Sequence, residues 1–133
     1  MSGYVPRLSG SVAAGFPSPA EQYLGPPLDL NQLLVRHPAS SFFVRVQGDS
    51  MVGKGILDGD ILVVDRSFRP ASGDVIIAAV NGEFTVKTLR IENRDGSCYY
   101  SLEPANPEYQ VITVRPGETL DYFGKVVGVV RRI

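Results

Sequence analysis

The stretch GDVIIAAVNGEFTVKTL, residues 73–89, decides the fold. Two segments rich in Val, Ile, Phe and Thr flank the dipeptide Asn81-Gly82. Asn-Gly in such a place favours a two-residue turn with positive φ at both positions, which joins neighbouring antiparallel strands. We therefore expect a β-hairpin whose strands cover 74–80 and 83–91.

Further short apolar segments surround this hairpin, and turn residues separate them. They are SFFVRV at 41–46, ILVVD at 61–65 after Asp58-Gly59, CYYSLEP at 98–104, YQVITV at 109–114 and YFGKVVGVVRRI at 122–133. We expect ENRDGS, residues 92–97, to form a polar loop. Many short strands with hardly any helix favour a compact, mostly β domain with one or two short helices.

The N-terminal part has a different character. Residues 1–27 repeat Pro, Gly and Ser without a sustained apolar period, so we expect a flexible, extended arm followed by a β domain over 28–133. Asp29 is suited to cap a short amphipathic helix, which would end before Pro38. The apolar residues of that helix are Leu30, Leu33 and Leu34.

The composition excludes several classes of protein. The chain has 133 residues, which suit one core, and its 13 basic and 14 acidic side chains leave a net charge of -1. Without a basic block we expect no strong direct binding to nucleic acid. The longest apolar runs are too short for a membrane span and the N-terminus lacks a signal-peptide pattern, so we expect a cytoplasmic protein. One cysteine, Cys98, and one histidine, His37, argue against a zinc site, and we expect no cofactor.

The tetrapeptide GDSM, residues 48–51, raises a chemical question. Ser50 falls where an expected strand gives way to a glycine-rich segment, so it is either a turn residue or a nucleophile. A serine hydroxyl attacks a carbonyl only when a neighbouring base takes its proton. His37 is better explained as a residue at the end of the short helix than as that base.

The three lysines are the other candidate bases. A lysine serves as a base near pH 7 only when its pKa falls well below the ordinary value of about 10.4, and burial of the ammonium can bring this about. Lys54 lies in a glycine-rich loop, where it would stay hydrated, whereas Lys87 and Lys125 lie in expected strands with apolar neighbours on the same face. The residues alone do not rank these two, and for each a stem packed on a strand with its amine in water remains the simpler interpretation.

Several stretches in this order resemble UmuD-type SOS mutagenesis proteins. They are AAGFPSPA at 13–20, DLNQLL at 29–34, GDSM at 48–51, DGD at 58–60 and GDVIIAAVNGEFTVKTL at 73–89. Such proteins belong with LexA-type repressors among the self-cleaving Ser-Lys peptidases. The likeness runs from about Ala13 to the C-terminus, and it implies a LexA/UmuD-like β domain.

The resemblance assigns roles to particular residues. It implies that Ser50 is the nucleophile, that Lys87 is the general base and that the Ala14-Gly15 bond is the one cut. Because Ser50 follows a strand end, the backbone N–H groups of Ser50 and Met51 are candidates for the oxyanion site. The arm before the scissile bond is shorter than is usual in UmuD. Cleavage within one chain and cleavage between two chains both remain open.

The resemblance also implies partners. A RecA filament on single-stranded DNA would promote the cut, and the shortened homodimer would join a Y-family, UmuC-like polymerase in synthesis past lesions. A signal peptidase would need a membrane anchor, and the 27 residues before the first expected helix are too few for the DNA-binding domain of a repressor. A non-catalytic interaction module, with Ser50 and Lys87 as relics, remains the alternative.

Overall fold

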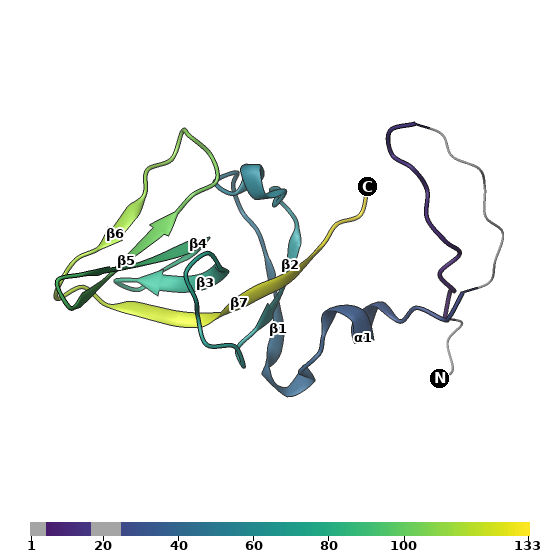
Figure 1. Cartoon of the computed structure of the whole chain (residues 1–133), viewed down its shortest axis with the longest axis horizontal. Helices are drawn as coiled ribbons and strands as arrows, with labels where there is room; N and C mark the ends of the chain where they lie inside the picture. The colour runs from purple at the N-terminus through teal and green to yellow at the C-terminus, as the bar shows by residue number, and fades with distance from the viewer. Residues whose placement is uncertain (1–4, 17–24) are drawn as a thin grey trace. The chain divides into compact units, whose positions relative to one another are not determined.

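The computed structural model describes residues 5–16 and 25–133 (Figure 1). The chain divides into two compact units, Met1–Arg36 and His37–Ile133. None of the helices in the described residues is long and apolar enough to cross a membrane.

The first unit contains a short backbone ladder and the helix α1 (Leu30–Leu34). Arg7 pairs with Pro27 in an antiparallel bridge, and N–H groups of Leu8, Gly25 and Leu28 donate to carbonyls across the ladder at 2.8–3.1 Å. The expected cap of α1 is confirmed, since the Asp29 carboxylate accepts from the Asn31 N–H at 2.9 Å. The ladder brings together residues that precede and follow Ala14-Gly15 in the chain.

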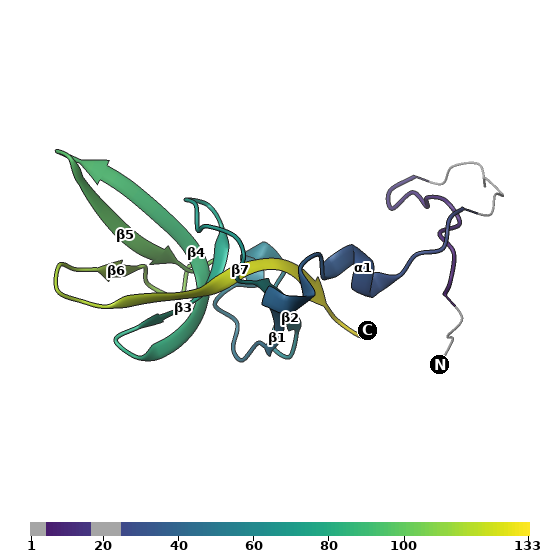
Figure 2. The same cartoon turned by 90° about the horizontal axis from the view of Figure 1, so that it is seen from below.

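The second unit is built on one antiparallel sheet. Its described strands are β1 (Ser41–Arg45), β2 (Ile61–Asp65), β3 (Val75–Val80), β4 (Glu83–Arg94), β5 (Ser97–Glu103), β6 (Ile112–Val114) and β7 (Leu120–Val130), in the order β1-β2-β7-β3-β4-β5-β6. Two 3-10 turns, η1 (Pro38–Ser40) and η2 (Val52–Lys54), flank β1. The C-terminal strand β7 therefore lies between β2 and β3, as Figures 1 and 2 show. The expected mostly β domain is confirmed.

Two hairpins of the sheet have the same turn chemistry. Asn81 and Gly82 have φ of 50° and 85° and join the paired residues Val80 and Glu83, so the expected hairpin is confirmed. Asp95 and Gly96 have φ of 51° and 80° and join β4 to β5. The expectation of a loop over 92–97 was therefore wrong. The polar residues there belong to strand ends that are exposed on both faces, where an apolar alternation is not required.

The core consists of two clusters on opposite faces of the sheet. Neighbouring residues of β3 take part in different clusters, Ile77 in the first and Ile76 in the second, because side chains alternate along a strand. The first cluster contains Val46, Met51, Ile56, Leu62, Val64 and Ile77, and the second contains Ile76, Ala78, Leu89 and Leu102. Met51 is 1% exposed, so the segment that follows Ser50 is fixed to the core.

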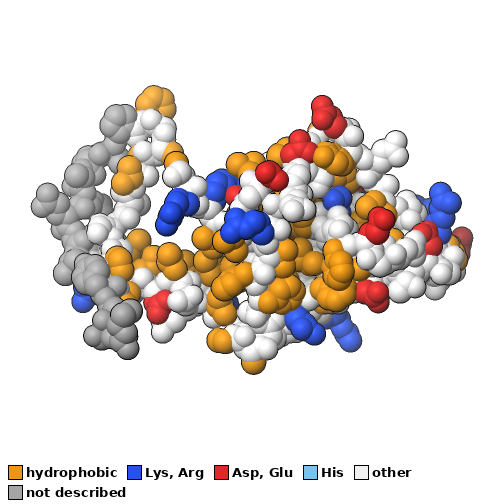
Figure 3. All heavy atoms as spheres, turned by 180° about the vertical axis from the view of Figure 1, so that it is seen from behind, with side chains coloured by type: hydrophobic (Ala, Val, Ile, Leu, Met, Phe, Trp, Pro, Cys, Tyr) orange, Lys and Arg blue, Asp and Glu red, His pale blue; other side chains and the backbone are white. Residues whose placement is uncertain are grey.

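Apolar side chains also remain on the surface of the second unit. In Figure 3 they gather on one face of it, and charged side chains lie mostly around them. On the outer part of β7 the exposed apolar residues are Val127, Val129 and Val130.

Truncation of the second cluster should destabilise the protein. Leu102 is 0% exposed, so Leu102→Ala is expected to lower the free energy of unfolding by about 2–5 kcal/mol. Leu57 is 39% exposed, and Leu57→Ala should cost about 1 kcal/mol or less. Urea denaturation of both variants measures the difference, and equal losses would contradict this description of the core.

Candidate active site

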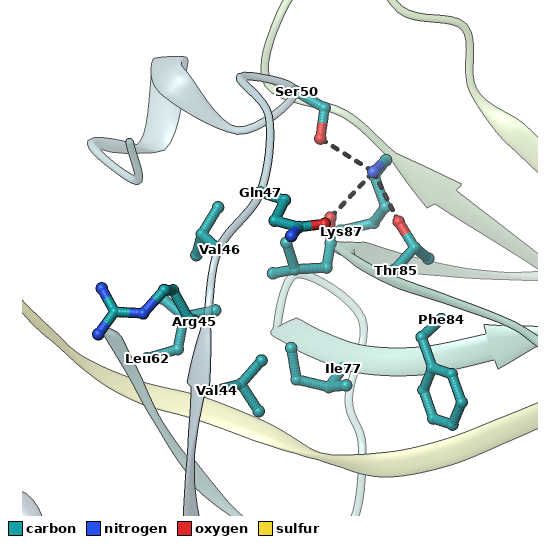
Figure 4. Close-up of a pocket in the computed structure, with 11 residues that line it drawn as sticks. Val44, Arg45, Val46, Gln47, Ser50, Leu62, Ile77, Phe84, Thr85 and Lys87 are labelled. Atoms are coloured by element: carbon teal, nitrogen blue, oxygen red, sulfur yellow. Dashed lines mark hydrogen bonds between the residues drawn. The ribbon is translucent and has the colours of Figure 1, made fainter. Parts of the chain in front are cut away.

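Ser50 and Lys87 meet at one end of a cleft in the second unit. Ser50 lies in the turn between β1 and η2, and Lys87 lies in the middle of β4. The Nζ of Lys87 is 3.0 Å from the Oγ of Ser50, although the two residues are 37 positions apart (Figure 4). The structure thus brings together the two residues to which the sequence assigned the roles of nucleophile and base.

The amine of Lys87 is held by two further acceptors. It donates to Thr85 Oγ1 at 2.7 Å and to the Val86 carbonyl at 3.1 Å, so three oxygen atoms, including Ser50 Oγ, fix its position. Thr85 precedes Lys87 by two positions and therefore lies on the same face of β4. Thr85 was not predicted as a site residue, although the alternation of side chains in EFTVK places it on the same face as Lys87.

Burial lowers the pKa of Lys87. The residue is 8% exposed, and loss of hydration disfavours the charged ammonium. Among the described residues, no carboxylate lies within ion-pair distance of its Nζ to offset that cost. The amine therefore loses its proton more readily than that of an exposed lysine, and the neutral form is the one that can accept a proton.

The other candidate bases have different partners. Lys125 Nζ lies 3.5 Å from Asp74 Oδ1 and 5.0 Å from the centre of the Phe68 ring, so it is an ion-paired lysine on β7. This ion pair distinguishes Lys125 from Lys87 as a candidate base, a distinction that the sequence alone does not provide. Lys54 is exposed in η2, as expected for a hydrated lysine.

The single histidine belongs to a separate polar cluster. His37 Nδ1 lies 2.7 Å from Asp65 Oδ2 and 3.2 Å from Ser67 Oγ. Burial alone would raise the pKa of Asp65, but hydrogen bonds from Ser67 and His37 hold it below its ordinary value. The histidine is thus engaged by Asp65, and no hydrogen bond joins it to Ser50 within the described residues. Cys98 is exposed on β5.

The cleft itself has a volume of about 300 Å³ and is lined by both polar and apolar side chains. Ser50, Thr85 and Lys87 supply polar groups, and Val44, Val46, Leu62, Ile77, Phe84 and Val86 line it together with Arg45 and Gln47 (Figure 4). β1 is the first strand of the sheet order, so in the described structure its outer edge has no neighbouring strand. A free edge beside a cleft can pair with an extended peptide.

Backbone donors lie beside the serine. Within residues 5–16 and 25–133, the N–H groups of Asp49, Ser50 and Met51 donate no hydrogen bond to another protein group. Ser50 and Met51 were the expected oxyanion donors, and Asp49 adds a third free N–H that the sequence analysis did not name. Ser50 is half-buried and Met51 is buried, a setting in which backbone donors generally find a partner, whereas Asp49 is exposed. The N–H groups of Ser50 and Met51 are therefore available to a ligand.

The expected scissile residues lie in the first unit. Ala14 and Gly15 are exposed, and apart from the adjoining residues no group in the described ranges lies within 4 Å of the place where a Cβ on Gly15 would be. They stand outside the ladder formed by residues 6–8 and 25–28. Their backbone is therefore free of the pairing that holds the neighbouring segments.

Comparison with known proteins gives consistent matches over nearly the whole chain. The family described as Peptidase S24-like matches residues 6–127. Protein SamA of Salmonella typhimurium is 43% identical over 127 residues, which cover 96% of this chain and 85% of SamA. Protein MucA of Escherichia coli is 39% identical over 123 residues, which cover 92% of this chain and 81% of MucA. The LexA repressor of Methylococcus capsulatus is 43% identical over 125 residues, which cover 93% of this chain and 59% of the repressor.

Fold and site define a mostly β protein that holds a serine hydroxyl against a buried lysine amine in a cleft. The chain belongs to the Peptidase S24-like family. The resemblance to UmuD-type SOS mutagenesis proteins of the LexA-like group is confirmed by these matches. Family membership favours a serine peptidase.

The titration of Lys87 tests the electrostatic description of the site. Because burial disfavours the ammonium, its amine should lose its proton at a lower pH than the ordinary lysine value of about 10.4. NMR detection of the side-chain resonances during a pH titration measures this, with a Ser50→Ala protein to prevent any cleavage and a Lys87→Met spectrum to assign the signal. Titration at or above the ordinary value would contradict the inferred desolvation.

Proposed function

We propose that the protein is a self-cleaving serine peptidase that cuts its own Ala14-Gly15 bond. Ser50 is the nucleophile and Lys87 is the general base. The observation that carries this proposal is the contact of 3.0 Å between Lys87 Nζ and Ser50 Oγ, in a buried setting where no carboxylate of the described residues is ion-paired with the amine.

The chemistry follows from the properties of these groups. The neutral amine of Lys87 takes the Ser50 proton while Oγ bonds to the carbonyl carbon of Ala14. The N–H groups of Ser50 and Met51 stabilise the charge that develops on the carbonyl oxygen. The tetrahedral intermediate collapses as Lys87 returns the proton to the leaving amine of Gly15. Lys87 then takes a proton from water, whose oxygen bonds to the carbonyl carbon of the ester between Ser50 and Ala14. As the ester bond breaks, Lys87 returns that proton to Ser50 Oγ, which restores the serine and leaves the carboxyl group of Ala14.

The size and exposure of the residues at the proposed scissile bond support this assignment. Ala14 and Gly15 are small and exposed, so their carbonyl can approach a serine closely without a steric conflict from side chains. An extended segment around them would pair along the free edge of β1, in the cleft that holds Ser50 and Lys87.

The biological role is inferred from the family. Cleavage during the SOS response would be promoted by a RecA filament on single-stranded DNA. It would remove residues 1–14 of the arm that precedes the β domain. The processed chain, as a homodimer, would then act as accessory subunit of a Y-family, UmuC-like polymerase in error-prone synthesis past lesions. The relatives SamA and MucA, which align with most of their own length, support this role for the whole chain.

Self-cleavage can be followed by intact mass at pH 7 and at about pH 10. The wild type is expected to yield a product beginning at Gly15, faster at the higher pH because more of Lys87 is then neutral. Ser50→Ala and Lys87→Ala should remain intact. Lys125→Ala is the matched control, since it removes a lysine that is ion-paired away from Ser50, and it should cleave like the wild type.

The outcomes separate this proposal from the alternative. A Lys87→Ala protein that is cleaved normally would overturn the assignment of the base. A wild type that never shortens, even with RecA, single-stranded DNA and nucleotide, would favour the non-catalytic interaction module, in which Ser50→Ala leaves partner binding intact.

A further inference from the structure

The loop between β5 and β6 lies against the backbone that bears the nucleophile. The Ala105 N–H donates to the Ser50 carbonyl at 2.7 Å, and the Gly53 N–H donates to the Ala105 carbonyl, also at 2.7 Å. The Asn106 side-chain amide donates to the Asp49 carbonyl at 3.0 Å. We call Pro104–Tyr109 the clamp loop, because it engages residues on both sides of Ser50 as well as Ser50 itself.

The clamp loop lies so close to Gly53 that this position has no room for a side chain. A Cβ added to Gly53 would lie 2.6 Å from the Ala105 carbonyl oxygen, a distance at which atoms overlap. Ala105 in turn packs against the first core cluster, to which Met51 belongs. The clamp loop is therefore fixed to the core on one side and to the serine turn on the other.

These contacts determine where two N–H groups point. In a planar trans peptide, the C=O of one residue and the N–H of the next point in opposite directions. The Asp49 carbonyl is directed to Asn106, so the Ser50 N–H points away from the clamp loop. The Ser50 carbonyl is directed to Ala105, so the Met51 N–H also points away from it. Neither N–H donates to another group in the described part of the chain.

We propose that Asn106 is a positioning residue that orients the Ser50 N–H toward the oxyanion of the reacting carbonyl. This rests on the proposed peptidase function and adds to it the group that sets its oxyanion site. Asn106 itself touches neither the substrate nor Lys87; it acts through the Asp49-Ser50 peptide. Its carbonyl oxygen Oδ1 accepts from the Glu108 N–H at 3.0 Å, which fixes the side chain so that the amide faces Asp49.

Tyr109 supports the same turn through a hydrogen bond to the side chain of Asp49. Its hydroxyl donates to Asp49 Oδ1 at 2.5 Å, and this bond to a carboxylate raises the pKa of Tyr109. Because this contact is one step further from the Ser50 peptide than that of Asn106, its removal should have a smaller effect.

The test compares self-cleavage rates over a range of pH. In Asn106→Ala, the rate at high pH should fall roughly 10- to 100-fold, because small misplacements of catalytic groups have effects of this size. The pH at which the rate is half-maximal should not change, since Lys87 keeps its surroundings. A change that merely loosened the whole site would move this midpoint as well, because a more hydrated Lys87 would regain its ordinary pKa.

Further variants separate the contacts of Asn106. Asn106→Asp keeps the acceptor for the Glu108 N–H but loses the donor to Asp49, so its rate at high pH should also fall. Tyr109→Phe, which keeps the ring, should slow cleavage less and remains informative if the Asn106 variants do not fold. Asn93→Ala is the matched control, because Asn93 lies at the exposed end of β4 and accepts only from Cys98 among its side-chain contacts.

Each outcome has a definite meaning. Wild-type cleavage with unchanged rates in Asn106→Ala and Asn106→Asp would overturn the positioning role and leave the peptidase proposal standing. A slower rate accompanied by a midpoint shifted upward would also overturn it in favour of a general structural role. A wild type that does not cleave at all would overturn both proposals.

Discussion

The site depends on the desolvation of one amine. Lys87 is buried on β4 beside Ser50, and among the described residues its amine is bonded to hydroxyl and carbonyl groups and to no carboxylate. A carboxylate there would stabilise the ammonium and oppose the loss of the proton that makes Lys87 a base. The hairpin of β3 and β4 fixes Lys87, while Met51 anchors the turn that carries Ser50 to the core.

The elements that were predictable from the sequence depend on local chemistry. The turn between β3 and β4 is specified by Asn81 and Gly82 themselves, which both have positive φ. Asp29 caps α1 through a hydrogen bond to a residue only two positions away. The hairpin at Asp95-Gly96 was missed because its flanking residues are polar on both faces, which resembles a loop in composition. Asp95-Gly96 adopts the same turn geometry as Asn81-Gly82, and Asp-Gly is itself a signal for such a turn.

The parts of the site that could not be predicted from the sequence are set by contacts between segments that are far apart in the chain. Lys87 and Lys125 have similar neighbours along the chain, and only tertiary structure gives one of them Asp74 as a partner. Asn106 lies 57 positions from Asp49 in a segment without a recognisable catalytic pattern, so nothing local connects it to the serine. Nucleophile and base were assigned by resemblance, whereas the groups that orient them emerge from the fold.

The most direct measurement of the central claim compares two midpoints in the same protein. One is the pH at which the self-cleavage rate is half-maximal, and the other is the pH at which the Lys87 amine is half-protonated in Ser50→Ala. The account predicts that the two coincide, below the ordinary lysine value, because a single deprotonation creates the base. A rate that continues to rise with pH well beyond the titration of Lys87 would contradict it.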